Sequence, residues 1–337
     1  MKLGLQLGYW GSQPPVDGNV ALAQEAERLG YDSVWTAESW GNDVFTPLAW
    51  IGAQTSTIKL GTAIAQLSAR TPAACAMSAL SIDRLSNGRM ILGLGVSGPQ
   101  VVEGWYGQPF AKPLARTREY VDIIRQILRR EAPLSNAGPH YPLPYHGPDA
   151  TNMGKPLRAN THPLRSDLPI YLGAEGPKNV TQTAAIADGW LPLYYNPFHP
   201  EIYSEQLKDA APTFEIAPLV LVNINDDLEQ ALLPAKMMLS FYVGGMGSKE
   251  HNFHKNLMAR MGYEEQADKI QELFMAGRRD EAVQAVPDQF ADEITLSGSR
   301  DRVRERLQAW EESPATTLLI MGAADESMLR TMAELAL

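Results

Sequence analysis

Short apolar runs alternate with longer amphipathic stretches along most of this 337-residue chain, and the alternation limits the possible fold more than any other feature. Eight apolar runs have the length and composition of β-strands, and the stretches after them have helical spacing. The predicted strands span residues 2–7, 33–36, 58–66, 89–94, 169–172, 189–193, 216–223 and 316–321. The predicted helices span residues 17–29, 46–55, 72–86, 113–130, 177–187, 226–242, 299–312 and 326–335.

Several of the predicted strands are apolar at every position instead of at alternate positions. Ile170-Tyr171-Leu172 and Leu219-Val220-Leu221-Val222 show this pattern. Strands of this kind are buried on both faces, as in a parallel sheet covered by helices. We therefore predict an α/β fold, a single (β/α)8 TIM barrel over residues 1–337, with a doubly wound open sheet as the alternative.

Two segments interrupt the alternation and predict insertions in the barrel. Residues 131–167 are rich in proline, glycine and polar side chains and show little helical periodicity. A loop of this length is unusual in a compact domain, so we interpret it as a functional insertion with its own turns. Residues 244–292 contain amphipathic pieces at 249–261, 264–276 and 280–286, which predict a helical insertion before the last strand–helix unit.

The overall charge and hydropathy argue against two classes of partner. The chain has 29 Lys and Arg against 39 Asp and Glu, a formal net charge of −10, whereas nucleic-acid-binding proteins carry basic surfaces. No apolar run approaches the ~20 residues that span a bilayer. The first residues resemble a strand and not a signal peptide. We expect a cytoplasmic protein with neither nucleic acid nor a membrane as partner.

Cysteine and histidine are too sparse to predict a disulfide or a metal site. Cys75 is the only cysteine, and the small residues around it predict a buried thiol. His251 and His254 are spaced i, i+3, but no third ligand of suitable type accompanies them. We predict no metal site and place both histidines on the surface.

A glycine motif follows the fourth predicted strand. Gly93-Leu94-Gly95-Val96-Ser97-Gly98 has the spacing of a dinucleotide-binding motif, which normally opens the first strand–helix–strand unit. Pro99 comes next, and the acidic residues at a suitable distance, Glu119 and Asp122, lie within a predicted helix. An NAD-dependent dehydrogenase is therefore an alternative only. We interpret the glycines as room for a flat ring system against the backbone.

Six stretches, in order along the chain, together resemble the luciferase-like superfamily. They are residues 26–38 (AERLGYDSVWTAE), 60–64 with 71–73 (LGTAI and TPA), 83–95 (DRLSNGRMILGLG), 138–143 (GPHYPL), 173–177 (GAEGP) and 187–190 (ADGW). The resemblance implies a barrel whose site lies at the C-terminal ends of the strands. Within the superfamily the chain looks most like the branch that uses the deazaflavin coenzyme F-420, with FMN-dependent members as the alternative.

The resemblance also suggests two acidic residues for catalysis. Glu38 matches a strand end where deazaflavin enzymes commonly carry an aspartate near the cofactor, so we expect it to contact the cofactor and to act in catalysis. The next position often holds a histidine that serves as acid or base, but here it is Ser39, whose hydroxyl cannot take up a proton near neutral pH. Some relatives carry an acidic residue after the fourth strand, and Glu103 is the nearest candidate replacement.

Two short segments are expected to meet the cofactor ring. Ala63 and Ile64 match the family's bulge, where a non-proline cis peptide supports the back of the deazaflavin ring. Gly61 independently indicates a bulge or a close backbone approach. Ser97 and Gly98 match positions whose backbone meets the polar edge or the side chain of the cofactor.

The loop after the fifth predicted strand is expected to bind the cofactor phosphate. Its glycines expose backbone N–H groups, its proline suits a first helical turn, and a helix N-terminus attracts anions. A lysine adds positive charge. The loop consists of Gly173, Ala174, Glu175, Gly176, Pro177, Lys178 and Asn179.

These features together imply an oxidoreductase that transfers a hydride between coenzyme F-420 and an unidentified small organic substrate. The cofactor would supply the redox chemistry, and the protein would supply position and electrostatics. The alternatives are an FMN-dependent luciferase-like monooxygenase, an NAD-dependent dehydrogenase and a cofactor-binding protein without turnover. The small residues at 73–79 could pack against a second subunit. Because members of the superfamily often form dimers, the resemblance also predicts a homodimer.

Overall fold

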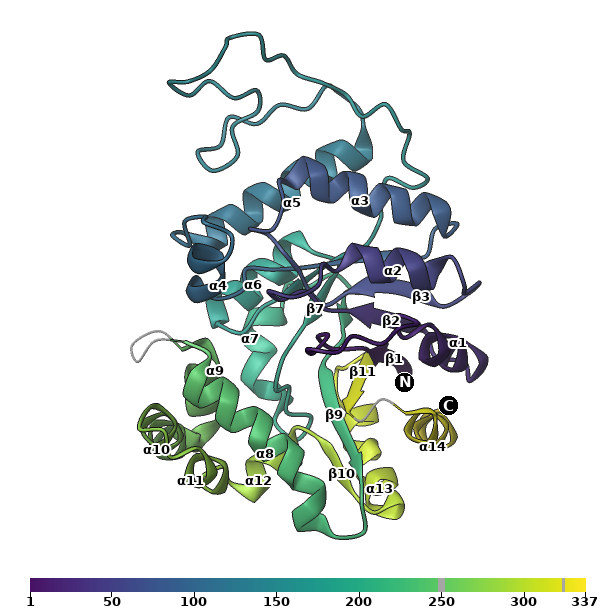
Figure 1. The fold of residues 1–337 in the computed structure, drawn as a ribbon, viewed down its shortest axis with the longest axis vertical. Coiled ribbons are helices and arrows are strands. Elements are labelled where there is room, and N and C mark those ends of the chain that lie inside the picture. Colours follow the sequence, from purple (N-terminus) through teal and green to yellow (C-terminus); the bar gives the residue numbers. More distant parts are fainter. Residues whose placement is uncertain (248–251, 323–324) are drawn as a thin grey trace.

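The computed structural model describes residues 1–247, 252–322 and 325–337 and folds them around a curled parallel sheet with helices on its outer side (Figure 1). The strands are β1 (Lys2–Gln6), β2 (Ser33–Thr36), β3 (Lys59–Thr62), β4 (Ala65–Gln66), β5 (Met90–Gly95), β6 (Ile170–Gly173), β7 (Gly189–Leu191), β8 (Glu215–Ile216), β9 (Leu219–Ile224), β10 (Leu296–Gly298) and β11 (Thr317–Gly322). They are hydrogen-bonded in the order β10-β9-β11-β1-β2-β3-β5-β6-β7-β8, and β4 pairs with β5. Every pair is parallel, as predicted.

All eight predicted strands are present, and two of them are divided. The strand predicted at 58–66 becomes β3 and β4, separated by Ala63 and Ile64. The strand predicted at 216–223 becomes β8 and β9, separated by Ala217 and Pro218. β10 was not predicted, because three residues are too few to show an apolar pattern.

The curl of the sheet brings side chains from distant strands together inside it. Trp35 of β2 and Tyr171 of β6 have ring centroids 5.9 Å apart, although β3 and β5 lie between these strands in the ladder. β8, at one end of the ladder, and β9, next to its other end, belong to one continuous segment, residues 215–224. This arrangement is of the TIM-barrel type. The interior cluster consists of Trp35, Ala63, Ile91, Tyr171, Leu191, Ala217 and Leu319.

The helices begin at residues that favour helix starts. Thr71 Oγ1 accepts a hydrogen bond from the Ala74 amide, 3.3 Å away, and Pro72 occupies the first turn of α3. Asp227 caps α8 in the same way. The helices are α1 (Val20–Arg28), α2 (Phe45–Gly52), α3 (Pro72–Leu85), α4 (Pro99–Gly104), α5 (Pro113–Arg129), α6 (Pro177–Ile186), η1 (Pro200–Tyr203), α7 (Ser204–Leu207), α8 (Leu228–Gly245), α9 (Phe253–Met258), η2 (Ala259–Tyr263), α10 (Glu264–Met275), α11 (Arg279–Gln284), α12 (Asp288–Glu293), α13 (Arg300–Glu312) and α14 (Glu326–Ala336).

The main apolar core lies between the sheet and these helices. Cys75 of α3 belongs to it and has no exposed surface, which confirms the prediction of a buried thiol. Burial raises the pKa of the Cys75 thiol to about 11. The thiol therefore keeps its proton at neutral pH and is a poor nucleophile.

The two predicted insertions differ in structure. Residues 131–167 form the irregular excursion above α3 and α5 in Figure 1, and their bridges join Leu134 to Leu157 and Asn136 to Leu143. The described part of residues 244–292 folds into short helices packed around α8, which confirms the helical prediction, while residues 248–251 lie outside the described part.

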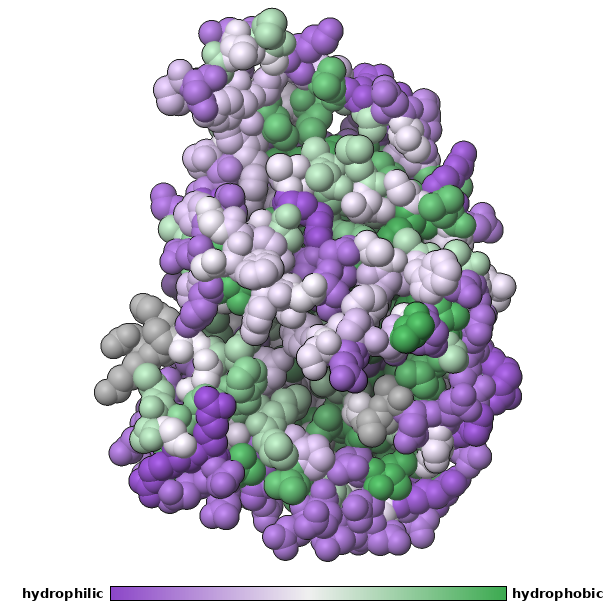
Figure 2. Space-filling view, in the orientation of Figure 1, coloured by the Kyte–Doolittle hydropathy of each residue, from purple (hydrophilic) through white to green (hydrophobic). Residues whose placement is uncertain are grey.

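The surface carries mostly polar side chains on the face drawn in Figure 2, and they gather over α10, α11 and α13 at the lower edge. Among the described residues, no helix has both the length and the apolar composition needed to cross a bilayer.

The contact between β2 and β3 inside the sheet gives a first test. A Cβ added at Gly61 would overlap the Trp35 ring, whereas one added at Gly104 would meet nothing within 4 Å. We expect Gly61→Ala to lower the free energy of unfolding by about 1–3 kcal/mol, because the ring must leave its packed position. Gly104→Ala is the control. Equal stability of the two variants in chemical denaturation would contradict this packing.

Candidate active site

A backbone bulge separates β3 from β4 at the C-terminal edge of the sheet. The Ala63–Ile64 peptide is cis, as predicted. Gln6 Nε2 donates a hydrogen bond to the Ala63 carbonyl oxygen at 3.0 Å, and the Ala63 amide donates to the Thr36 carbonyl oxygen at 2.8 Å. The adjacent strand β2 and the next strand along the sheet, β1, therefore hold the bulge in place.

Glycines on β5 and β6 make room for this bulge. A Cβ at Gly93 would overlap the carbonyl oxygen of Thr62. A Cβ at Gly95 would lie 2.8 Å from Ile64 Cδ1, and one at Gly173 would lie 3.2 Å from Ile64 Cγ2. We interpreted the glycines of the motif as room for a ring system, but Gly93 and Gly95 accommodate the protein's own backbone and side chain.

Glu38 lies at the same edge and is buried, with 3% of its surface exposed. Its carboxylate accepts two hydrogen bonds from the Arg70 guanidinium, one of them at 3.0 Å from Nη1 to Oε2. It also accepts backbone hydrogen bonds from Gln66 at 2.8 Å and from Val44 at 3.3 Å. Burial acts to lower the pKa of Arg70, but its hydrogen bonds and ion pair with Glu38 outweigh this and raise it. Glu38 thus anchors the end of β4.

The residues after β5 lie on a more exposed part of the edge. Ser97 has a left-handed backbone with φ of 60°, and Gly98 precedes α4. Glu103 is exposed on α4, and its Oε1 accepts a hydrogen bond from the Phe110 amide at 3.3 Å. Ser39 is partly buried beside Glu38.

The predicted phosphate loop joins β6 to α6. Gly176 is the residue before the helix, and a Cβ there would meet nothing within 4 Å. Pro177 occupies the first turn of α6, and Lys178 is exposed beside it. The indole nitrogen of Trp190 donates to the Ala174 carbonyl oxygen at 2.8 Å, which fixes the start of the loop. The loop therefore presents a helix N-terminus with open space in front of Gly176.

Glu175, in the middle of this loop, contacts the helical insertion. His254 Nδ1 lies 3.0 Å from Glu175 Oε1, and Arg260 Nη2 donates to the Glu175 carbonyl oxygen at 2.7 Å. The prediction of a surface position for His254 was wrong, because its side chain is only 16% exposed. The Glu175 carboxylate, 3.0 Å from Nδ1, accounts for a polar ring in this largely buried place. His251 lies outside the described residues.

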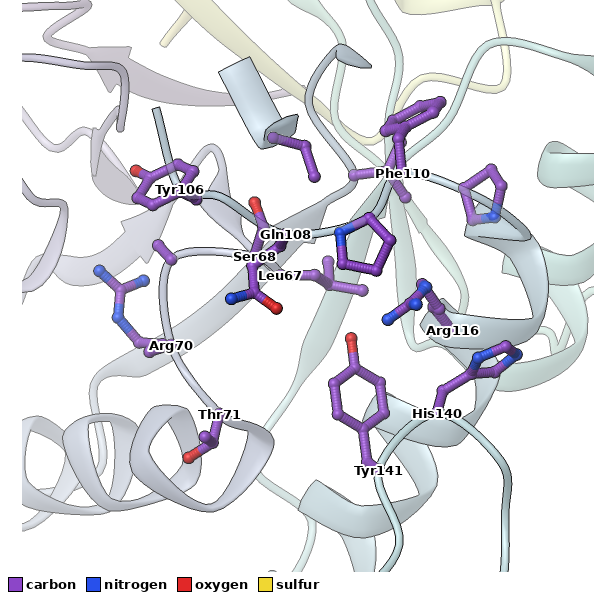
Figure 3. A pocket seen from close by; sticks show the side chains of 15 residues that line it. Leu67, Ser68, Arg70, Thr71, Tyr106, Gln108, Phe110, Arg116, His140 and Tyr141 are labelled. Atoms are coloured by element: carbon purple, nitrogen blue, oxygen red, sulfur yellow. The ribbon is translucent and has the colours of Figure 1, made fainter. Parts of the chain in front are cut away.

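A cavity of about 440 Å³ opens between the loop after β4 and the start of α5. Figure 3 shows Arg70, Gln108, Arg116 and Tyr141 around it. Arg116 hydrogen-bonds the Tyr141 hydroxyl. The insertion at 131–167 thus contributes to the wall of this cavity.

One carboxylate of α5 holds the part of the insertion that reaches the cavity. Glu119 Oε1 accepts hydrogen bonds from the Tyr141 amide and the Asn136 side-chain amide, both at 2.7 Å. Asn136 and Leu143 exchange two backbone hydrogen bonds and close a short hairpin, and a Cβ at Gly138 would overlap the Glu119 carboxylate. The hairpin therefore wraps around Glu119.

Sequence reasoning missed several residues of this region. Gln6 could have been noticed, because it is the one polar side chain late in an apolar strand. Arg70, Arg116 and Tyr141 carry no such signal, since their partners lie far away in the sequence.

The buried pair of Glu38 and Arg70 gives a second test. Arg70→Leu removes the cation and leaves the buried carboxylate with two backbone partners, so we expect a loss of about 3 kcal/mol in unfolding free energy. Arg28→Leu is the matched control, because Arg28 also makes two hydrogen bonds to one carboxylate, that of Glu25, but is exposed. A loss at Arg70 no larger than at Arg28 in urea denaturation would contradict the anchoring role.

Comparison with known proteins shows which family this chain belongs to. The family model of the luciferase-like monooxygenases matches residues 4–317. A protein of Mycobacterium tuberculosis, provisionally named as a coenzyme F420-dependent oxidoreductase, is 52% identical over 344 aligned residues, which cover 99% of each chain. A 5,10-methylenetetrahydromethanopterin reductase of Archaeoglobus fulgidus is 26% identical over 87% of this chain and 86% of its own.

Solved structures show the same fold. The coenzyme F420-dependent tetrahydromethanopterin reductase of Methanopyrus kandleri superposes with a TM-score of 0.79 at 22% identity, covering 99% of this chain and 97% of its own. An F420-dependent secondary alcohol dehydrogenase superposes with a TM-score of 0.75 at 14% identity over the same shares. With a family model that spans nearly the whole sequence, this chain belongs to the luciferase-like monooxygenase family.

Proposed function

We propose that this protein is an oxidoreductase that transfers a hydride between the deazaflavin coenzyme F-420 and a small organic substrate. The observation that carries the proposal is the 52% identity over 99% of both chains with the M. tuberculosis protein named for coenzyme F420. The bulge and the open helix N-terminus at one edge of the sheet support it, because they fit a ring and a phosphate.

The ring of the cofactor is proposed to lie against Ala63 and Ile64, with Ser97 and Gly98 at its polar edge. Gln6 supports this placement, because its hydrogen bond fixes the orientation of the Ala63 carbonyl group. A backbone held by hydrogen bonds from β1 and β2 is a rigid surface for a flat ring, and rigidity reduces the entropy lost on binding.

The phosphate is proposed to bind the loop formed by Gly173, Ala174, Glu175, Gly176, Pro177, Lys178 and Asn179. The N-terminus of α6 supports this placement, since a helix carries partial positive charge there. The space in front of Gly176 leaves room for an anion.

Proton transfer to or from the substrate has two candidate groups. The bound coenzyme would supply the hydride chemistry, so the protein must hold the substrate and exchange its proton. Glu103 is proposed as an acid or base on the exposed helix α4. Glu38 is proposed to act close to the cofactor, where its pairing with Arg70 keeps the end of β4 in position.

The complete architecture is proposed to be one closed (β/α)8 barrel over residues 1–337 with insertions at 131–167 and 244–292. Backbone hydrogen bonds on both sides of residues 215–224 support closure. The Ala217 amide donates to the Trp190 carbonyl oxygen at 2.9 Å, and the Thr316 amide donates to the Ile216 carbonyl oxygen at 2.8 Å.

Two further proposals concern the setting in which the protein works. We propose a homodimer, supported by Met77 and Leu85 of α3, which are 64% and 84% exposed beside small residues. The cytoplasm is the proposed compartment, on the basis of the charge and hydropathy of the sequence.

FMN-dependent monooxygenation is the second candidate function. The oxygenating component of 3,6-diketocamphane monooxygenase, solved with FMN, superposes with a TM-score of 0.65 at 18% identity. The fold alone therefore suits either cofactor.

A cofactor titration tests these alternatives. We expect coenzyme F-420 to bind more tightly than FMN, NAD or NADP when binding is followed by fluorescence. Tighter binding of FMN would favour the monooxygenase. Tight binding of coenzyme F-420 without turnover of any alcohol, ketone or imine would favour a cofactor-binding protein.

A substitution in the loop tests the phosphate site. Gly176→Asp places a carboxylate in the open space before α6, so we expect at least tenfold weaker binding of coenzyme F-420, a change of ~1.4 kcal/mol or more. Gly104→Asp adds the same charge where a Cβ meets nothing within 4 Å and serves as the control. Equal affinity of both variants would rule out the phosphate assignment.

A further inference from the structure

The proposed phosphate loop contains a carboxylate, Glu175, directly before Gly176. A carboxylate beside a bound phosphate weakens binding, because like charges repel at short distance. The arrangement around Glu175 therefore matters for any anion in this loop.

Two basic side chains from the helical insertion contact Glu175. His254 of α9 places Nδ1 3.0 Å from Glu175 Oε1, at an angle outside hydrogen-bond geometry. Arg260 of η2 donates to the Glu175 carbonyl oxygen at 2.7 Å. The side chains of Glu175 and His254 are 17% and 16% exposed, so the solvent screens their interaction only in part.

Asn252 fixes the helix that carries His254. Its Nδ2 donates to the carbonyl oxygens of Tyr242 at 3.1 Å and Val243 at 2.8 Å, and its Oδ1 accepts from the Lys255 amide at 2.9 Å. Asn252 is 2% exposed. The position of α9 is therefore set by α8, and His254 is held against the loop by it.

The two tyrosines that face His254 stay uncharged near neutral pH. Tyr194 and Tyr242 face its ring, with centroids 6.0 and 4.9 Å away. Burial raises the pKa of both tyrosines, so both stay protonated. On its own helix, Lys255 is paired with Asp268 at 2.6 Å. Histidine is the side chain that ordinarily changes charge nearest to neutral pH.

We propose that His254 and Arg260 are positioning residues, His254 offsetting the charge of the Glu175 carboxylate and Arg260 holding the Glu175 backbone, and that together they allow the loop at 173–179 to bind the phosphate of the coenzyme. This inference rests on the proposed function. It makes the insertion part of the cofactor site and makes cofactor affinity depend on the charge of His254.

The direction of the dependence follows from the charges. When His254 is protonated, its positive charge offsets the Glu175 carboxylate and favours a nearby phosphate. A neutral imidazole would not offset the carboxylate and the coenzyme would then bind more weakly, so the charges give an affinity that falls as the pH rises. Arg260 keeps its charge throughout, so its contribution does not change with pH.

The experiment is a fluorescence titration of coenzyme F-420 at several pH values between mildly acidic and mildly alkaline. For the wild type we expect affinity to fall about tenfold as the pH rises, equivalent to ~1.4 kcal/mol. His254→Gln should bind weakly at every pH, and Glu175→Gln should bind tightly at every pH. The double variant should behave like Glu175→Gln, because removal of the carboxylate removes the need for the histidine.

Two further variants separate this role from a general effect on structure. His199→Gln is the matched control, because His199 lies 3.1 Å from Glu201 in an exposed pair, and it should keep the wild-type pH profile. Arg260→Gln should weaken binding at every pH and preserve the pH dependence. Circular dichroism and thermal melting check that each variant is folded.

Two results would overturn the inference: a wild-type affinity that does not change with pH, or a double variant that stays as weak as His254→Gln. Failure of the proposed function looks different, since the wild type would then bind FMN in preference to coenzyme F-420, or bind neither.

Discussion

The backbone bulge between β3 and β4 exists only because the strands beside it carry glycine. Any side chain at Gly93 would occupy the place of the Thr62 carbonyl oxygen, and side chains at Gly95 and Gly173 would displace Ile64. β3 and β4 both pair with β5, and the register shifts by one residue across the bulge, from Leu60 opposite Met90 to Ala65 opposite Leu94. The β4 amide of Gln66 meets the Glu38 carboxylate. The geometry of the whole edge thus depends on the close packing of one peptide against its neighbours.

Much of the fold could be predicted from the sequence because its signals are local. Continuous apolar runs identified the buried parallel strands, and Pro72 marked the start of α3 within one residue. The cis peptide came from a resemblance over a short motif. β10 could not be predicted, because a strand of three residues is too short to show a hydrophobic periodicity.

The candidate site was predicted less completely, for a physical reason. Backbone positions such as Ala63 and Gly176 follow from glycine and proline chemistry in their own loops. The side chains that complete them come from far along the chain, as His254 does for Glu175, and only the packing of α9 against the β6–α6 loop brings the two together. In the sequence alone, His254 has no visible partner and resembles any polar surface residue. Its position was therefore wrongly predicted to be on the surface.

The hairpin of the 131–167 insertion has a consequence for how such proteins diversify. Its inner end is clamped by the single carboxylate of Glu119, and the far end of the insertion is held by Arg165, which pairs with Asp83 of α3 at 2.7 Å. Loop length between these two anchors can therefore change during evolution without moving Tyr141 at the cavity wall. Exchanging the residues inside the clamp, in contrast, would reshape the wall of the cavity to which Tyr141 contributes, while the parallel sheet stays as it is.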